Sequence, residues 1–162
     1  MKTLMLLRHA KSSWDDSEAR DFDRSISDRG KRDAPKVAEM LVKRGVLPDL
    51  IVSSPAVRAR QTIEAVVDAA KLTAIPQFDD GIYGATSPVL MRLIRRLPDS
   101  AGTVMLVGHN PTFEEMVARL SGHDEHMPTA ALACIQFQVG RWEDVEDGQG
   151  KLLWLVSPKH PG

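Results

Sequence analysis

The sequence predicts an α/β fold with three layers, α/β/α, around a mostly parallel central sheet, and with an antiparallel hairpin near the C-terminus. Short apolar runs alternate with segments of helical periodicity along nearly the whole chain, as in strands joined by crossover helices. The first runs are continuously apolar, which is typical of parallel strands buried on both faces. The last two runs flank a polar, glycine-containing stretch, residues 140–150, which favours a hairpin with a long loop.

Composition narrows the class of protein. The chain has 162 residues, of which 43% are hydrophobic and 27% charged, and it shows no repeat, linker or low-complexity segment. We therefore expect residues 1–162 to form a single globular domain with its own core. The formal net charge of -1 provides no basic field, so neither nucleic acid nor a membrane is expected as a partner. A cytoplasmic location is expected, because no signal peptide is recognisable and the single cysteine, Cys134, suits a reducing compartment.

Six strands and four helices account for the pattern. The apolar runs predict strands at residues 3–7, 50–53, 75–78, 103–107, 131–139 and 152–156.

The helices follow from apolar positions three and four residues apart. The first is expected over residues 28–44, between Ser27 as N-cap and Gly45 just past its end, although Pro35 inside it removes a backbone hydrogen bond. The second spans residues 57–71, the third begins with Ser87 as N-cap and Pro88 in its first turn, and the fourth begins near Pro111. Between the first strand and the first helix lies the longest aperiodic connection, which marks a functional loop.

Arginine and histidine follow three of the predicted strands. Arg8-His9 ends the first strand, Arg58 follows the second, and His109 ends the fourth. Ligands of open α/β sheets bind outside the carboxyl ends of the strands, so these side chains are expected to converge on one crevice. Two guanidinium and two imidazole groups suit a phosphoryl group, which has three equatorial oxygens to satisfy. Histidine is also a competent nucleophile toward phosphorus.

These residues resemble a known family. The segments Leu7-Arg8-His9-Ala10, Ser53-Ser54-Pro55 with Arg58, and Gly108-His109-Asn110-Pro111 are similar to the histidine phosphatase superfamily, the phosphoglycerate-mutase-like enzymes, and most of all to its small SixA-type phosphohistidine phosphatases. The resemblance implies that His9 is the transiently phosphorylated nucleophile, and that Arg8, Arg58 and His109 bind the phosphoryl oxygens. The segment from Arg24 to Gly30 is similar to a further family segment, which implies that Arg24 is another phosphate ligand.

The chain departs from the family in two places. Many members have glycine where this chain has Ala10, a change also found among SixA-like members. The mutases and sugar bisphosphatases carry a glutamate after the third strand that protonates the leaving oxygen. In the corresponding segment of this chain, residues 78–84, the acidic residues are the aspartates Asp79 and Asp80, and there is no glutamate. An imidazole, with a pKa of about 6.5, leaves more readily than an alkoxide, so this difference favours a phosphohistidine substrate. Asp80 is the candidate general acid if one is needed.

The sequence therefore predicts a phosphatase without cofactor that hydrolyses phosphohistidine on a partner protein through a phosphohistidine enzyme intermediate. Two alternatives remain: a phosphomonoesterase of the same superfamily acting on small phosphorylated metabolites, and a non-catalytic phosphoprotein-binding module. The nucleophile His9 argues against the module, because binding alone does not require it. No metal is expected, since the arginines and histidines supply the positive charge and His123 and His126 sit in a stretch typical of a polar surface turn.

Overall fold

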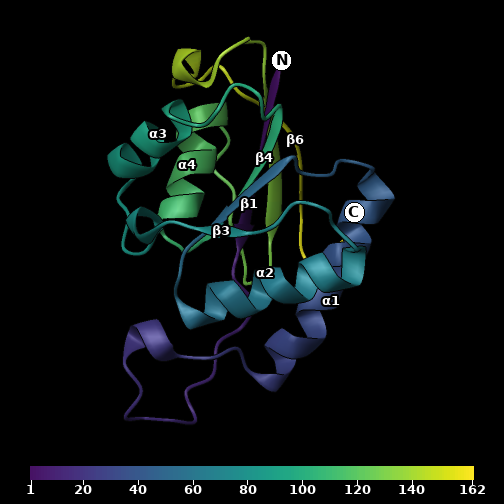
Figure 1. The fold of residues 1–162 in the computed structure, drawn as a ribbon, viewed down its shortest axis with the longest axis vertical. Coiled ribbons are helices and arrows are strands. Elements are labelled where there is room, and N and C mark those ends of the chain that lie inside the picture. Colours follow the sequence, from purple (N-terminus) through teal and green to yellow (C-terminus); the bar gives the residue numbers. More distant parts are fainter.

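The structure, a computed structural model, describes residues 1–162 and has the three predicted layers (Figure 1). Helices α1 (Asp28–Arg44) and α2 (Val57–Ala70) cover one face of the sheet, and α3 (Ser87–Arg95) and α4 (Thr112–Ser121) cover the other. The predicted fold class is confirmed. None of the helices combines the length and the apolar character needed to cross a membrane.

All six strands form one mixed sheet in the order β3-β2-β4-β1-β5-β6. Their bounds are β1 (Lys2–Arg8), β2 (Leu50–Ser53), β3 (Gln77–Phe78), β4 (Thr103–Gly108), β5 (Leu132–Phe137) and β6 (Lys151–Val156). The first four strands in the sequence run parallel to one another, whereas β5 is antiparallel to β1 and β6 is antiparallel to β5. The predicted C-terminal hairpin is thereby confirmed.

Successive side chains of β1 point alternately to the two faces of the sheet and belong to two separate hydrophobic cores. Leu4 and Leu6 point to the α3/α4 face, and Met5 and Leu7 point to the α1/α2 face, all four with no exposed surface. Successive residues of a strand face opposite sides, so a continuously apolar strand is the sequence that buries both.

Helix α1 begins and ends at the residues that the sequence predicted. The Ser27 side chain accepts a hydrogen bond from the Gly30 amide, and Gly45 has φ 69° just after the last helical residue, a left-handed conformation that glycine adopts without strain. Pro35 does not interrupt this helix. In α3 the N-cap is Thr86 instead of Ser87, which is the first helical residue.

The third and fifth strands are shorter than predicted. The apolar run at residues 75–78 yields only the two exposed residues of β3, and Ile75 is 82% exposed. This strand lies at the sheet edge, where half of its backbone hydrogen bonds have no partner strand, so little pairing holds it. β5 ends at Phe137, and the long loop after it forms the 3-10 helix η3 (Trp142–Asp144), which buries Trp142.

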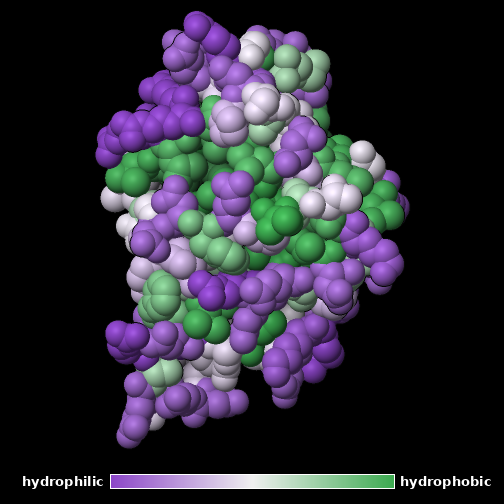
Figure 2. All heavy atoms as spheres, in the orientation of Figure 1, coloured by the Kyte–Doolittle hydropathy of each residue, from purple (hydrophilic) through white to green (hydrophobic).

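The parallel pairing of β1 with β4 positions the candidate site. Arg8 is in register with Gly108, and the His9 amide donates to the Gly108 carbonyl at 3.1 Å, so both strands end side by side. A side chain at Gly108 would lie 2.7 Å from the Phe113 ring, so glycine is required for α4 to pack here. The connection between β1 and α1, at the bottom of Figure 1, forms a predominantly hydrophilic lobe in Figure 2.

Candidate active site

The structure brings Arg8, His9, Arg58 and His109 together at the carboxyl edge of the sheet. The rings of His9 and His109 have centroids 5.2 Å apart. His9 and Arg58 are each only 7% exposed, and the charges of Arg8 and Arg58 both act on the two histidines. The predicted convergence of the three strand ends is therefore present in the fold.

His9 is held as a neutral imidazole with one free nitrogen. Its Nδ1 lies 2.7 Å from the Ala10 carbonyl oxygen, which can only accept, so Nδ1 carries the proton and donates it. Burial, with smaller contributions from nearby positive charges, lowers the pKa of His9 to about 3. At neutral pH its Nε2 therefore has an unprotonated lone pair, which is the state that a nucleophile requires.

His109 is oriented by Ser54. The His109 Nε2 lies 2.7 Å from the Ser54 hydroxyl oxygen, which also accepts a hydrogen bond from the Ala56 amide. Burial and then the charge of Arg58 lower the pKa of His109 to about 4, so the ring is neutral. If the hydroxyl donates to Nε2, the proton of His109 is on Nδ1 and available to a bound oxygen.

Unsatisfied buried polar atoms mark the same place. Arg8 Nε, His109 Nδ1 and Asn110 Oδ1 are the only buried side-chain nitrogen or oxygen atoms of the chain without a hydrogen-bond partner. Each such group costs about 1–3 kcal/mol, and functional sites are one setting in which this cost is retained. All three residues lie at the ends of β1 and β4. Two of the atoms are nitrogens that can donate to an anion, which suits a ligand with several acceptor oxygens.

Glu114 accepts hydrogen bonds from residues that adjoin Arg8 and His109. Its Oε2 accepts hydrogen bonds from Asn110 Nδ2 at 3.0 Å, from the Met127 amide at 3.1 Å and from His126 Nδ1 at 3.0 Å. The Met127 carbonyl in turn accepts from Arg8 Nη1 at 3.0 Å and from Asn110 Nδ2 at 2.8 Å. Sequence reasoning missed this role, because the partners come from a loop that only the fold places beside α4.

A network around Asp21 connects Arg24 with Arg58. Asp21 lies in the 3-10 helix η1 (Asp21–Asp23), where its carboxylate accepts from Arg24 at 3.0 Å, from Arg58 at 3.1 Å and from the Tyr83 hydroxyl at 2.8 Å. Arg24 Nη2 also donates a hydrogen bond to the Ser12 hydroxyl, and Arg24 Cζ lies 3.4 Å from the centre of the Trp14 ring. The predicted ligand Arg24 thus joins the cluster through Asp21, a residue that the sequence did not single out.

The remaining sequence candidates, Asp80, His123 and His126, make no hydrogen bond or ion pair with the four clustered side chains, and the His126 side chain pairs only with Glu114. Asp80 begins the 3-10 helix η2 (Asp80–Ile82) with an exposed side chain, while Tyr83 from the same segment contacts Asp21 and lies edge-on to His109 with a centroid distance of 5.8 Å. His123 and His126 are exposed. No three His, Cys, Asp or Glu side chains are grouped so as to hold a metal ion.

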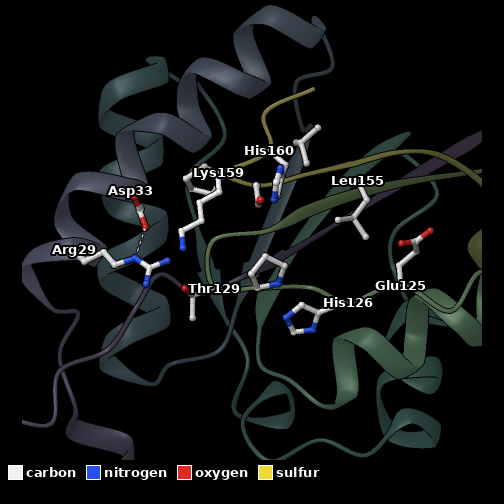
Figure 3. A pocket seen from close by; sticks show the side chains of 12 residues that line it. Arg29, Asp33, Glu125, His126, Thr129, Leu155, Lys159 and His160 are labelled. Carbon is white, nitrogen blue, oxygen red and sulfur yellow. Dashed lines mark ion pairs between the residues drawn. The ribbon is translucent and has the colours of Figure 1, made fainter.

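A pocket apart from this cluster lies between α1 and the end of β6 (Figure 3). Its volume is about 380 Å³, and its walls include Arg29, Asp33, His126 and Lys159. Arg29 and Asp33 form an ion pair at 3.4 Å. The residues at the strand ends do not line it, so it is separate from the candidate active site.

Together, the fold and the cluster define an α/β protein with a histidine–arginine site suited to a tetrahedral oxyanion. The chain belongs to the histidine phosphatase superfamily (branch 1), whose profile matches residues 4–85. It is 40% identical to an uncharacterized chloroplastic protein of Arabidopsis thaliana, over 97% of this chain and 78% of that protein.

Two solved structures are similar over nearly the whole chain. A protein of Agrobacterium tumefaciens assigned as the phosphohistidine phosphatase SixA is 32% identical, with a TM-score of 0.83 over 97% of this chain and 98% of that chain. A protein of Nakamurella multipartitia with the same assignment is 26% identical, with a TM-score of 0.84 over 97% and 96% of the two chains. The predicted family resemblance is confirmed.

The lowered pKa of His9 predicts that stability falls in mild acid. Between about pH 6.5 and about pH 3, the unfolded chain binds a proton at His9 that the folded chain does not, so this contribution is complete above pH 6.5 and is lost as the pH falls. From pH 7 to pH 5 the free energy of unfolding should fall by about 2 kcal/mol more in the wild type than in His9→Gln. Urea unfolding at both pH values measures this difference, with His123→Gln as an exposed control. An equal pH dependence in wild type and His9→Gln would contradict the prediction.

Proposed function

We propose that this protein is a phosphatase that removes the phosphoryl group from a phosphohistidine side chain of a partner protein, through a phosphohistidine intermediate on its own His9. One observation carries the proposal: His9 is buried and neutral, with Nε2 free, beside Arg8, Arg58 and His109. The similarity to two structures assigned as SixA supports the substrate class.

Each residue of the cluster has a role in this proposal. His9 Nε2 forms a bond to phosphorus as the bond from phosphorus to the leaving nitrogen breaks, in line and on the opposite side. Arg8 and Arg58 hold the equatorial oxygens and neutralise their charge, while His109 donates from Nδ1. Arg24 adds positive charge at the rim. Water then attacks the phosphorus, and the electron pair of the broken P–N bond returns to His9 Nε2.

The choice of phosphohistidine depends on the leaving group. An alkoxide needs a proton donor, and the segment at residues 78–84 provides no glutamate and an exposed Asp80. An imidazole, with a pKa of about 6.5, departs near neutral pH with much less assistance. A phosphoramidate therefore suits the site better than an alkyl ester.

The test is a side-by-side assay of phosphate release. A protein carrying phosphohistidine and phosphoimidazole should be hydrolysed fastest, aryl phosphates more slowly and alkyl phosphates slowest, because the rate should follow the pKa of the leaving group. Asp80→Asn should change the phosphohistidine rate little. If alkyl phosphates are the best substrates and Asp80→Asn removes that activity, the protein is a small-molecule phosphatase. Binding of phosphoprotein without phosphate release would instead identify a binding module.

Activity should persist after exhaustive chelation. The arginines and histidines provide the positive charge that a metal ion would bring to the phosphoryl oxygens. Phosphate release is measured before and after dialysis against a chelator, and then with added divalent ions. Loss of activity on dialysis and its recovery with one of these ions would contradict the prediction.

A further inference from the structure

Asp21 lies at the mouth of the site and is held there by both its side chain and its backbone. Its Oδ2 accepts from Arg58 Nη2 at 3.1 Å and from the Tyr83 hydroxyl at 2.8 Å, and its backbone carbonyl accepts from Arg58 Nη1 at 2.7 Å. Its Oδ1 accepts from Arg24 Nη1 at 3.0 Å. Three side chains from different parts of the chain therefore fix this carboxylate.

The carboxylate keeps capacity for one more hydrogen bond. Oδ2 already accepts two hydrogen bonds, whereas Oδ1 accepts only one and retains an acceptor position. The Asp21 side chain is 54% exposed, which allows water or a leaving group to reach it. It lies outside both hydrophobic cores, so its substitution should not affect folding.

Arg58 places Asp21 next to the proposed phosphoryl position. Asp21 uses two of the five N–H groups of this guanidinium, so the other three remain for phosphoryl oxygens. The negative charge of Asp21 also acts on His109, where it opposes the lowering of the pKa by burial and Arg58. Asp21 is thus close to two of the proposed phosphoryl ligands.

Substrate binding should change the proton affinity of Asp21. In the free protein, hydrogen bonds from Tyr83 and Arg58 hold the pKa of this carboxyl below its usual value, so it is ionised. A phosphoryl dianion on Arg58 would be a like charge beside the carboxylate and would draw on the same guanidinium. Both effects raise the pKa of a carboxyl group, so Asp21 would gain proton affinity only while a phosphoryl group is in the site.

We propose that Asp21 is the proton-transfer residue of this site, supplied by the loop between β1 and α1. The proposal rests on the proposed function and extends it to leaving groups that need a proton. It also differs from the sequence expectation, which gave this role to Asp80.

The proton balance of the two steps is complete. In the first, His9 Nε2 bonds to phosphorus, the bond to the leaving atom breaks, and that atom keeps the electron pair and receives the proton of the Asp21 carboxyl. In the second, the water oxygen bonds to phosphorus, the P–Nε2 bond breaks with its pair on Nε2, and a water proton passes to the Asp21 carboxylate. Asp21 is protonated again, and the products are free phosphate and the protonated leaving group.

Rapid-quench measurement of phosphate on His9, with phosphoimidazole as substrate, tests the proposal. Asp21→Asn should form the phosphoenzyme at nearly the wild-type rate, because imidazole needs little assistance, but should hydrolyse it about 10²- to 10⁴-fold more slowly, so the phosphoenzyme accumulates. Asp21→Glu, which keeps a carboxylate, should recover part of the hydrolysis rate. Asp23→Asn is the matched control: Asp23 belongs to the same η1 and pairs with the exposed Arg20 at 2.8 Å, so its substitution should change neither step.

A second measurement separates proton transfer from a positioning role. With aryl phosphates of graded leaving-group pKa, Asp21→Asn should make the phosphorylation rate depend more steeply on that pKa than in the wild type. An unchanged slope, an equal loss in both steps, or a gain in activity would overturn the role of Asp21 and leave His9 as nucleophile. Absence of phosphate on His9 in wild type and in Asp21→Asn, with turnover intact, would instead overturn the proposed function.

Discussion

His9→Ala is expected to abolish turnover without disturbing the fold. The His9 imidazole has an unprotonated nitrogen that hydrogen bonds leave free, and loss of a nucleophile typically costs on the order of 10⁴-fold or more in kcat. The strand pairing around it should persist, because His9 joins β4 and the segment at Ala130 through its backbone. Steady-state kinetics, circular dichroism and acid-quenched labelling of the wild type measure these effects.

His123→Ala is the control for this substitution, since His123 is exposed and away from the cluster. It should retain wild-type kcat, and the wild type should carry acid-labile phosphate on His9. Full activity of His9→Ala, or label on a serine or on Cys134, would contradict the assignment.

Arg58→Lys should lower kcat/KM strongly even though the charge is kept. Arg58 holds Asp21 with two N–H groups and is left with three for phosphoryl oxygens, whereas a lysine ammonium has three donors in all and no planar fork. Losing one charge-assisted hydrogen bond of about 1.5–3 kcal/mol reduces kcat/KM by roughly 10- to 150-fold. Arg60→Lys is the matched control, because Arg60 lies on the same helix but is exposed and stacks on Phe78 at 4.7 Å. Unchanged kcat/KM in Arg58→Lys would show that the guanidinium fork is not used.

Local sequence signals predicted much of this structure. The bounds of α1 follow from the side-chain cap of Ser27 and the left-handed turn at Gly45, both of which depend on neighbouring residues alone. The continuously apolar strands predicted a buried parallel sheet, and the arginines and histidines after them predicted a site at its edge. This inference succeeds because parallel pairing brings the carboxyl ends of strands together whatever the loops between them do.

Other features depend on contacts between distant segments. The run at residues 75–78 predicts a strand of four residues, but Pro76 cannot donate a ladder hydrogen bond and the edge position leaves the run exposed, so β3 has only two residues. In the same way, Asp21 and Glu114 looked like ordinary acidic surface residues in the sequence. Their partners Arg58, Tyr83 and Met127 lie 13 to 62 residues away along the chain.

The sequence by itself therefore determined the fold class, the family and the strand-end arginines and histidines, because periodicity, capping and strand polarity are local properties. Only the tertiary structure decided the protonation of His9 and the hydrogen-bond partners that surround it. A pKa and a hydrogen-bond network depend on burial and on which charges lie a few ångströms away, and chain folding alone sets those distances.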